Sequence, residues 1–175
     1  CFGGVETDYG ELERLCEKID VPYIIKRTQI GEIIFDIRKE PNPCSLCARM
    51  RRGALHDATK EAGCNKLALG HHLDDAVETF MMNLLNEARV GCFSPVTYLS
   101  RKELYMIRPM LFARESDCVR VVRREELPVI KSKCPADGCT QRQRTKELLD
   151  SLEKEYPDVR YKLLGAMQRG HIDGS

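Results

Sequence analysis

The chain has 175 residues and a mass of 20.0 kDa, which is the size of a single domain. Its 28 Lys and Arg residues nearly balance 27 Asp and Glu residues, and 42% of the residues are hydrophobic, which is typical of a globular protein and excludes a disordered chain, collagen or a coiled coil. No apolar run approaches the roughly 20 residues that span a bilayer, and no stretch resembles a secretory signal, so we expect a cytoplasmic protein without a membrane segment.

Helix and strand signals alternate in the first half of the chain. Thr7 and Asp8 are candidate caps for the first helix, and Gly63 is a stop signal for the next one. In chain order the patterns predict a helix over 12–19, strands over 22–28 and 33–37, a helix from Ser45 to about Ala62, a buried strand over 66–70 and a helix over 74–85.

The second half begins with a loop and β-ribbon pattern between Gly91 and Pro109. Beyond it the sequence predicts a helix over 114–126, a short strand at 129–130, and helices over 140–156 and 158–169 on either side of Pro157. A succession of helix, short apolar strand and helix is typical of a parallel sheet with helices over its faces. We therefore expect an α/β fold, specifically a three-layer sandwich.

The near-zero net charge hides one basic region. Residues 101–146 hold twelve Lys and Arg against six Asp and Glu, a net of +6. Such a region is either a phosphate-binding surface or a solvated basic face, and composition alone does not separate the two.

Nine cysteines are an odd number, so they cannot all pair within one chain. Cys44 and Cys47 lie three positions apart at a predicted helix start, where both thiols can face one metal or each other and where the helix terminus stabilises a thiolate. The pair alone fits a redox dithiol, half of a zinc site, part of an iron-sulfur site or two buried thiols.

Cys134 directly precedes Pro135, a pairing that recurs in iron-sulfur binding sequences, and it is the natural third ligand. Cys139 follows five positions later and could complete a four-thiolate set of the kind that binds structural zinc. The spacing therefore also fits a zinc site with four protein ligands.

Polar residues follow the predicted strand over 66–70 directly, in the sequence Gly70-His71-His72-Leu73-Asp74-Asp75. Open α/β sheets bind ligands at the carboxyl ends of their strands, and neighbouring carboxylates suit magnesium or the orientation of a nucleotide. Acidic residues in a first helical turn are also ordinary complements of the helix dipole, but two His followed by two Asp exceed what capping requires.

Together these motifs resemble the tRNA 2-thiocytidine synthetase (TtcA-like) family of PP-loop ATP pyrophosphatases. The resemblance runs in consistent order from about Gly3 to Gly174, and its motifs are the following: Pro43-Cys44-Ser45-Leu46-Cys47, Arg51-Arg52-Gly53, Gly70 to Asp75, Arg108-Pro109 and Cys134-Pro135-Ala136-Asp137-Gly138. The resemblance implies an adenine-nucleotide α-hydrolase-like fold, with a PP-loop domain over residues 1–130 and a C-terminal segment over 131–175 that carries the third cluster cysteine and helices.

The resemblance also implies an activity and its cofactors. ATP would adenylate the C2 carbonyl oxygen of a tRNA cytidine, and sulfur would displace AMP. It assigns a 4Fe-4S cluster to Cys44, Cys47 and Cys134, and ATP and magnesium to Gly70, His71, His72, Asp74 and Asp75. Asp74, Asp75 and Arg51 would be catalytic, with Arg51 or Arg52 at a phosphate or the substrate. Implied partners are tRNA, a sulfur donor such as a cysteine desulfurase, and a second copy in a homodimer.

Two departures from the family pattern stand out. The SGGxDS phosphate loop does not occur in the sequence, which begins at Cys1 without an initiator Met. The intact downstream motifs favour a sequence that begins after this loop over a loss of ATP chemistry, and these residues alone are expected to bind ATP poorly. Relatives commonly carry His at the position of Cys139. A fourth thiolate there could close the site or bind zinc, so a zinc site remains an alternative to a cluster.

Two competing functions remain. Another PP-loop adenylating enzyme, such as a lysidine synthetase, shares the fold but uses an amine nucleophile and gives no role to three thiols. A non-catalytic, zinc-stapled domain that binds RNA through its basic region would also fit the missing loop.

Overall fold

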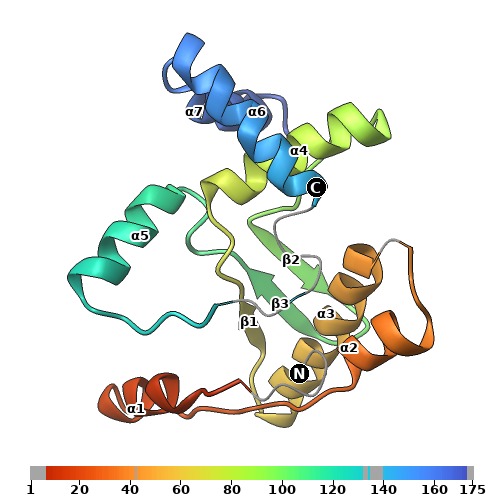
Figure 1. Ribbon diagram of the computed structural model, residues 1–175, viewed down its shortest axis with the longest axis vertical. Coiled ribbons are helices and arrows are strands. Elements are labelled where there is room, and N and C mark those ends of the chain that lie inside the picture. The colour runs from red at the N-terminus through yellow and green to blue at the C-terminus, as the bar shows by residue number, and fades with distance from the viewer. Residues whose placement is uncertain (1–6, 42, 132–133, 135–139, 173–175) are drawn as a thin grey trace. The chain divides into compact units, whose positions relative to one another are not determined.

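The computed structural model describes residues 7–41, 43–131, 134 and 140–172. In chain order its elements are α1 (Gly10–Lys18), α2 (Ile30–Glu32), the π-helical turn η1 (Ile33–Ile37), α3 (Pro43–Glu61), β1 (Lys66–Ala68), α4 (Leu73–Glu87), β2 (Val96–Leu99), β3 (Leu104–Ile107), α5 (Glu115–Arg124), α6 (Gln141–Glu155) and α7 (Val159–Arg169) (Figure 1). No helix within these described ranges is both long and apolar enough to cross a membrane.

Contacts group the chain into two compact units. Unit 1 comprises residues 1–64 and 121–137, and unit 2 comprises residues 65–120 and 138–175. The division expected from the sequence, residues 1–130 and 131–175, stays a prediction.

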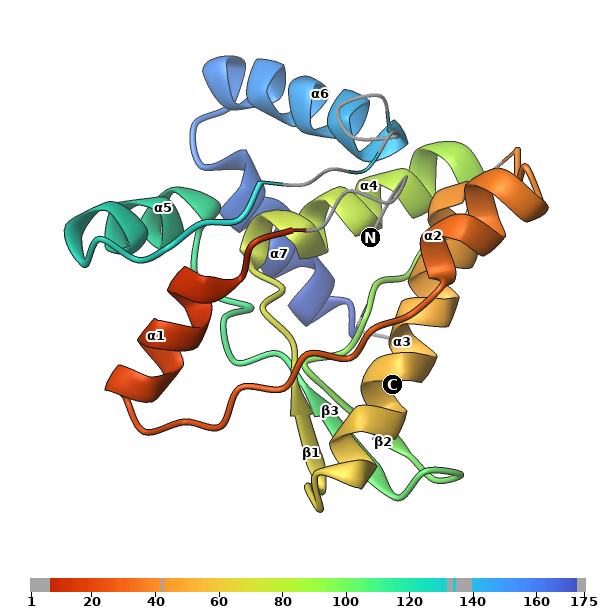
Figure 2. The same ribbon diagram turned by 60° about the horizontal axis from the view of Figure 1, so that its bottom comes forward.

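Unit 1 is helical, and its packing centres on α2, η1 and α3, which contact one another (Figure 2). Ile30 and Ile34 are buried four residues apart, so they share one helical face. Gly63 has a φ of +70°, the left-handed conformation that ends a helix, and the chain leaves α3 there.

Unit 2 contains a three-stranded sheet in the order β1-β3-β2 (Figure 1). β1 and β3 are parallel, with Leu67 opposite Met106, whereas β2 and β3 form an antiparallel hairpin with Tyr98 opposite Tyr105. Residues after β1 and β3 therefore lie at one edge of the sheet, because the carboxyl ends of parallel neighbours coincide.

The core of unit 2 forms where α4, α6 and α7 pack together. Its buried apolar residues are Leu73, Ala76, Val77, Leu111, Leu149 and Leu164. Leu73, Ala76 and Val77 recur at three and four residues, so the first turns of α4 present one apolar face to this core. This burial fixes the start of α4, which carries the polar motif.

The predicted helices and the β-ribbon are confirmed, as are the α/β class and its parallel strand pair. Three strand predictions, all in unit 1, are wrong. Residues 22–28 and 129–130 are not in regular structure, because a β-branched run makes a strand only beside a hydrogen-bonded neighbour, and no described strand pairs with them. Residues 33–37 are helical, because the Ile30–Ile34 spacing outweighs β-branching.

Candidate functional site

The cysteine pair lies in the first turn of α3. The helix begins at Pro43, whose fixed φ and missing N–H suit a first helical position, and Cys44 and Cys47 follow one turn apart. Cys44 is exposed, whereas Cys47 and Cys134 are half-buried. All three are in unit 1.

The pKa of Cys47 responds to both other thiols. Burial raises this pKa above its ordinary value, the Arg51 guanidinium opposes the rise, and the Cys134 and Cys44 thiols add to it. A charge on Cys47 is thus felt by both other thiols and by Arg51, which lies one turn further along α3.

The three thiols are not arranged around one point. Within the described ranges, no group of three or more His, Cys, Asp or Glu side chains is already arranged to hold a metal ion. None of the described cysteines is in a disulfide. Cys44 is on the surface, so its side chain can reorient toward the other two. Cys139, the alternative fourth ligand, lies outside the described residues.

The polar motif of unit 2 forms the start of α4. His72 is the N-cap: its Nδ1 accepts a hydrogen bond from the Asp75 N–H (3.3 Å), and the Asp75 carboxylate accepts one from the His72 N–H (3.0 Å). This reciprocal capping box satisfies two backbone N–H groups that have no hydrogen-bond partner within the helix. Asp75 therefore has the structural role at the helix start that the sequence also allowed.

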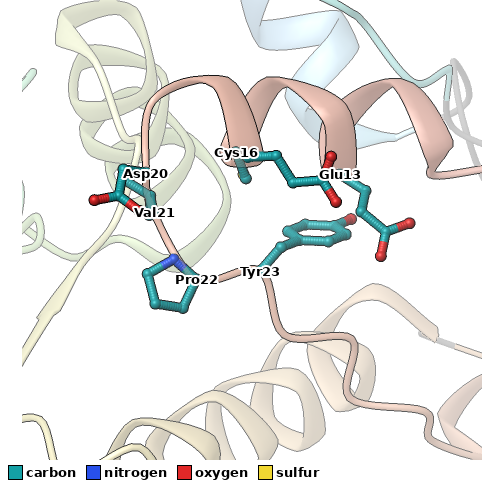
Figure 3. A pocket seen from close by; sticks show the side chains of 7 residues that line it. Glu13, Cys16, Asp20, Val21, Pro22 and Tyr23 are labelled. Atoms are coloured by element: carbon teal, nitrogen blue, oxygen red, sulfur yellow. The ribbon is translucent and has the colours of Figure 1, made fainter.

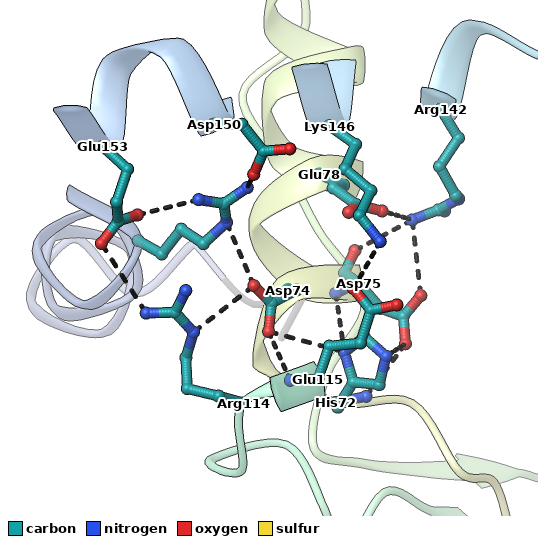
Figure 4. A network of polar contacts seen from close by, with 11 residues as sticks. His72, Asp74, Asp75, Glu78, Arg114, Glu115, Arg142, Lys146, Asp150 and Glu153 are labelled. Atoms are coloured by element: carbon teal, nitrogen blue, oxygen red, sulfur yellow. Dashed lines mark hydrogen bonds and ion pairs between the residues drawn. The ribbon is translucent and has the colours of Figure 1, made fainter. Parts of the chain in front are cut away.

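Asp74 is buried in a network of ion pairs (Figure 4). Its Oδ2 accepts a hydrogen bond from the Glu115 N–H at 2.7 Å, and its Oδ1 lies 3.0 Å from Arg160 Nε and 3.4 Å from Arg114 Nε. Arg160 is 3% exposed and also pairs with Asp150 and Glu153 of α6. Both oxygens of Asp74 are thus engaged by the protein itself, and they tie α4 to α5, α6 and α7.

A second group of contacts surrounds Asp75. Arg142, in the first turn of α6, donates to Glu78 Oε2 (2.9 Å) and to Thr79 Oγ1 (3.0 Å), and its guanidinium lies 3.6 Å from Asp75 Oδ1. Burial raises the pKa of Glu78, and the Arg142 hydrogen bond opposes that rise. The side chain of Asp75 keeps 23% of its surface exposed, against 7% for Asp74. Of these two carboxylates, Asp75 is the more accessible.

His71 and Arg108 follow β1 and β3 at the shared carboxyl edge of the parallel pair. Both contact Phe93: the His71 ring centroid is 4.9 Å from that of Phe93, and the Arg108 guanidinium lies 4.6 Å from it. His71 Nδ1 is buried, and no described residue hydrogen-bonds to it. At Gly70 an added Cβ would meet no atom within 4 Å. The edge thus has a buried imidazole nitrogen without a described partner, and the residue before it is an exposed glycine.

The predicted site residues separate into two sets. Cys44, Cys47, Cys134 and Arg51 are in unit 1, and Gly70 to Asp75 are in unit 2. Sequence reasoning missed Arg142 and Arg160 as partners of the α4 carboxylates. Arg160 had a signal: with Leu164 and Met167 four and seven residues later, it occupies the apolar face of its helix, where an arginine needs a carboxylate.

The fold and these sites define an α/β protein with polar groups at the carboxyl edge of a parallel strand pair and a separate cysteine cluster. The family model for the PP-loop domain matches residues 5–152. The chain belongs to the PP-loop domain family.

Two curated relatives illustrate its position in this family. The chain is 40% identical over 137 residues to the tRNA-cytidine(32) 2-sulfurtransferase of Geobacter sulfurreducens. The aligned region covers 75% of this chain and 53% of the relative. It is 37% identical over 176 residues to the protein of the same name from Syntrophotalea carbinolica, covering 95% of the chain and 64% of the relative. The chain therefore spans between about half and two thirds of their length.

A solved structure extends the similarity to three dimensions. The U34-tRNA thiolase NcsA from Methanococcus maripaludis, described with its [4Fe-4S] cluster, superposes with a TM-score of 0.75 at 28% identity. The match covers 91% of this chain and 54% of that one. The family resemblance and the adenine-nucleotide α-hydrolase-like fold expected from the sequence are confirmed.

Proposed function

We propose that the chain is part of an enzyme that thiolates tRNA, using ATP and an iron-sulfur cluster. In this reaction AMP is transferred from ATP to the C2 oxygen of a cytidine with release of pyrophosphate, and a sulfur nucleophile then displaces AMP. The observation that carries the proposal is the position of Cys44 and Cys47 near the start of α3 in unit 1, with Cys134 of the same unit in electrostatic interaction with Cys47. The names of the relatives support the same substrate class and product.

The three cysteines would hold the cluster. Thiolates are the ligands that iron-sulfur clusters require. When bound by three cysteines, a 4Fe-4S cluster supplies one iron with an open coordination position at which a sulfur species can be held. The cationic Arg51 beside Cys47 would offset part of the negative charge that three thiolates bring. We also propose Arg51 at a phosphate of the substrate.

The nucleotide and its magnesium would bind at the segment from Gly70 to Asp75. The open space at Gly70 and the unsatisfied His71 Nδ1 both suit a ligand at the carboxyl edge of β1. Between the two carboxylates, Asp75 would face the ligand with His72, because Asp74 has both oxygens engaged by Arg160, Arg114 and a backbone N–H. Asp74 would act as a positioning residue that holds the start of α4.

The partners follow from the chemistry. The substrate would be tRNA, and a cysteine desulfurase or an equivalent donor would supply the sulfur. A desulfurase delivers it as a persulfide, so a thiol reductant would supply the two electrons that convert it to the sulfide-level nucleophile that displaces AMP. We also propose a cytoplasmic location, where the tRNA substrate is available. A homodimer is part of the proposal and is tested by the oligomeric state of the full protein. Lysidine synthesis is disfavoured because it leaves the three thiols without a role.

The test is a nucleoside profile of tRNA from a strain that lacks the gene. We expect 2-thiocytidine to disappear and to return with the wild-type gene but not with Cys47→Ala. Cys64→Ala is the matched control, because Cys64 is an exposed thiol of the same unit outside the proposed set. Unchanged thiocytidine in a strain without a second such gene would contradict the proposal.

A further inference from the structure

Unit 1 contains a basic pocket of about 540 Å³. Its lining residues are Thr7, Tyr9, Ile25, Lys26, Arg27, Thr28 and Arg51. Three of its seven lining residues are cationic and none is acidic. A second pocket of unit 1, about 420 Å³ in volume, has the opposite character: Glu13, Glu17 and Asp20 line it beside Tyr23 (Figure 3). Of these two pockets, one is therefore cationic and the other anionic.

Arg51 connects the basic pocket to the cysteine site. It lines the pocket, and it follows Cys47 by four residues on α3, so the two side chains share a helix face. A group bound by Arg51 in the pocket would therefore lie beside the thiols.

The pocket also keeps its charge accessible. Lys26 pairs with Glu61 at 2.6 Å, but the two side chains are 45% and 61% exposed, so the pair is weak and open to exchange with another anion. Tyr9, the residue before α1, is 37% exposed and lends an aromatic surface. The hydroxyl of Thr28 adds a neutral hydrogen-bonding group.

We propose that this pocket binds a phosphodiester of single-stranded RNA and stacks the adjoining base on Tyr9, next to the cysteine site; the proposal rests on the tRNA-thiolating function above. Guanidinium and ammonium groups bind backbone phosphates, and aromatic side chains stack unpaired bases of RNA loops. A loop held this way presents the neighbouring nucleotide toward the thiols.

The same phosphate chemistry occurs in ATP, but the lining favours RNA. Triphosphates bind with a magnesium ion that takes oxygen ligands, often from carboxylates, and no lining residue is acidic. The pocket instead combines dispersed cations with an aromatic side chain, which is the pattern of a groove for single-stranded nucleic acid.

The test is fluorescence anisotropy of a labelled RNA hairpin that carries a tRNA anticodon loop, with the full-length protein. Arg51→Gln should weaken binding about fivefold and reduce the salt dependence by roughly one phosphate contact. Tyr9→Ala should weaken it about tenfold, whereas Tyr9→Phe should bind as wild type because it keeps the ring. The matched control is Arg49→Gln: it removes the same charge from the same helix at an exposed position that does not line the pocket, and it should change affinity less than twofold.

Two results would overturn the proposal. Equal losses in Arg49→Gln and Arg51→Gln would mean diffuse attraction to α3, and displacement of the hairpin by magnesium-free ATP in the wild type but not in Arg51→Gln would assign the pocket to a nucleotide. Circular dichroism and metal content of each variant show whether it is folded. Because the readout is RNA binding, the pocket can fail while thiolation stands, and thiolation can fail while the pocket binds RNA.

Discussion

The cysteine cluster of unit 1 and the carboxylates at the start of α4 are both groups of ligand-type side chains, but the protein satisfies them to different degrees. Asp74 is 5% exposed, accepts a backbone hydrogen bond and faces two arginines. Cys44 is exposed, and Cys47 and Cys134 are half-buried thiols. The carboxylate group is largely buried and ion-paired, whereas the cysteine side chains are at least partly exposed.

The difference shows that a clustered motif does not by itself reveal whether its atoms are available. In the sequence, Asp74 and Asp75 are equivalent neighbours. In the structure Asp74 connects four helices, while Asp75 keeps a partly exposed carboxylate. We therefore expect substitutions in the Asp74 network to act on stability and substitutions of the cysteines to act on metal binding.

The largest effect on stability is expected for Arg160→Met, which keeps most of the buried volume and removes the charge. It leaves Asp74, Asp150 and Glu153 without their shared cation, so the free energy of unfolding should fall by about 3 kcal/mol. Urea unfolding measures this change.

The control for that experiment is Arg124→Met, which removes an arginine from an exposed pair with Glu125. Exposed pairs contribute little, and the change should stay within about 0.5 kcal/mol. Equal effects of the two substitutions would show that the Asp74 network does not support the fold.

An intermediate effect is expected for His72→Ala, which removes the side-chain acceptor at the start of α4. Loss of an N-cap costs about 1 kcal/mol, and His72→Asn should restore most of it because asparagine is a good N-cap. Thermal unfolding of the two variants compares them directly. An alanine variant as stable as wild type would show that the capping box does not stabilise the start of α4.

His71 predicts a smaller, pH-dependent effect. Burial lowers its pKa; Asp75 opposes this, and Arg108, Arg142 and His72 reinforce it. Because the folded-state pKa is below the unfolded value of about 6.5, the unfolded state binds more protons between the two values. The contribution of His71 is therefore complete above pH 6.5 and is lost as the pH falls through the folded pKa. His71→Gln should flatten the decline of stability between about pH 7 and pH 5, and an unchanged slope would contradict this.

The smallest change in stability is expected for Cys44→Ala in the metal-free protein. The thiol is exposed, so its removal should alter the free energy of unfolding by less than about 0.5 kcal/mol. A loss above about 2 kcal/mol, measured by the same urea unfolding, would mean that this cysteine has a structural role.

Sequence reasoning located the elements whose signal is periodic or capped. The spacing of Leu73, Ala76 and Val77 identifies a helix, and Gly63 marks the end of the preceding one. The family and the α/β class also follow from ordered motifs. The extent of the sheet was predicted wrongly. Residues 22–28 have the composition of a strand, but strand pairing depends on a neighbouring strand that composition does not reveal.

The site shows the same limit. Adjacent residues such as Cys44 and Cys47 are visible in the sequence, but Arg160 meets Asp74 across 86 positions. Only packing of α7 against α4 brings them together, so neither the burial of Asp74 nor the accessibility of Asp75 could be read from the motif. Phe93, which lies between His71 and Arg108, was invisible for the same reason.

The most direct test of the central claim is the iron, zinc and labile sulfide content of the anaerobically prepared protein, with its absorption spectrum. We predict about four irons and four sulfides per chain, lost in Cys44→Ala, Cys47→Ala and Cys134→Ala and retained in Cys64→Ala and Cys139→Ala. Stoichiometric zinc that is lost in Cys139→Ala as well as in the first three variants would contradict the account, because it would mean a closed structural site in place of a cluster with an open iron.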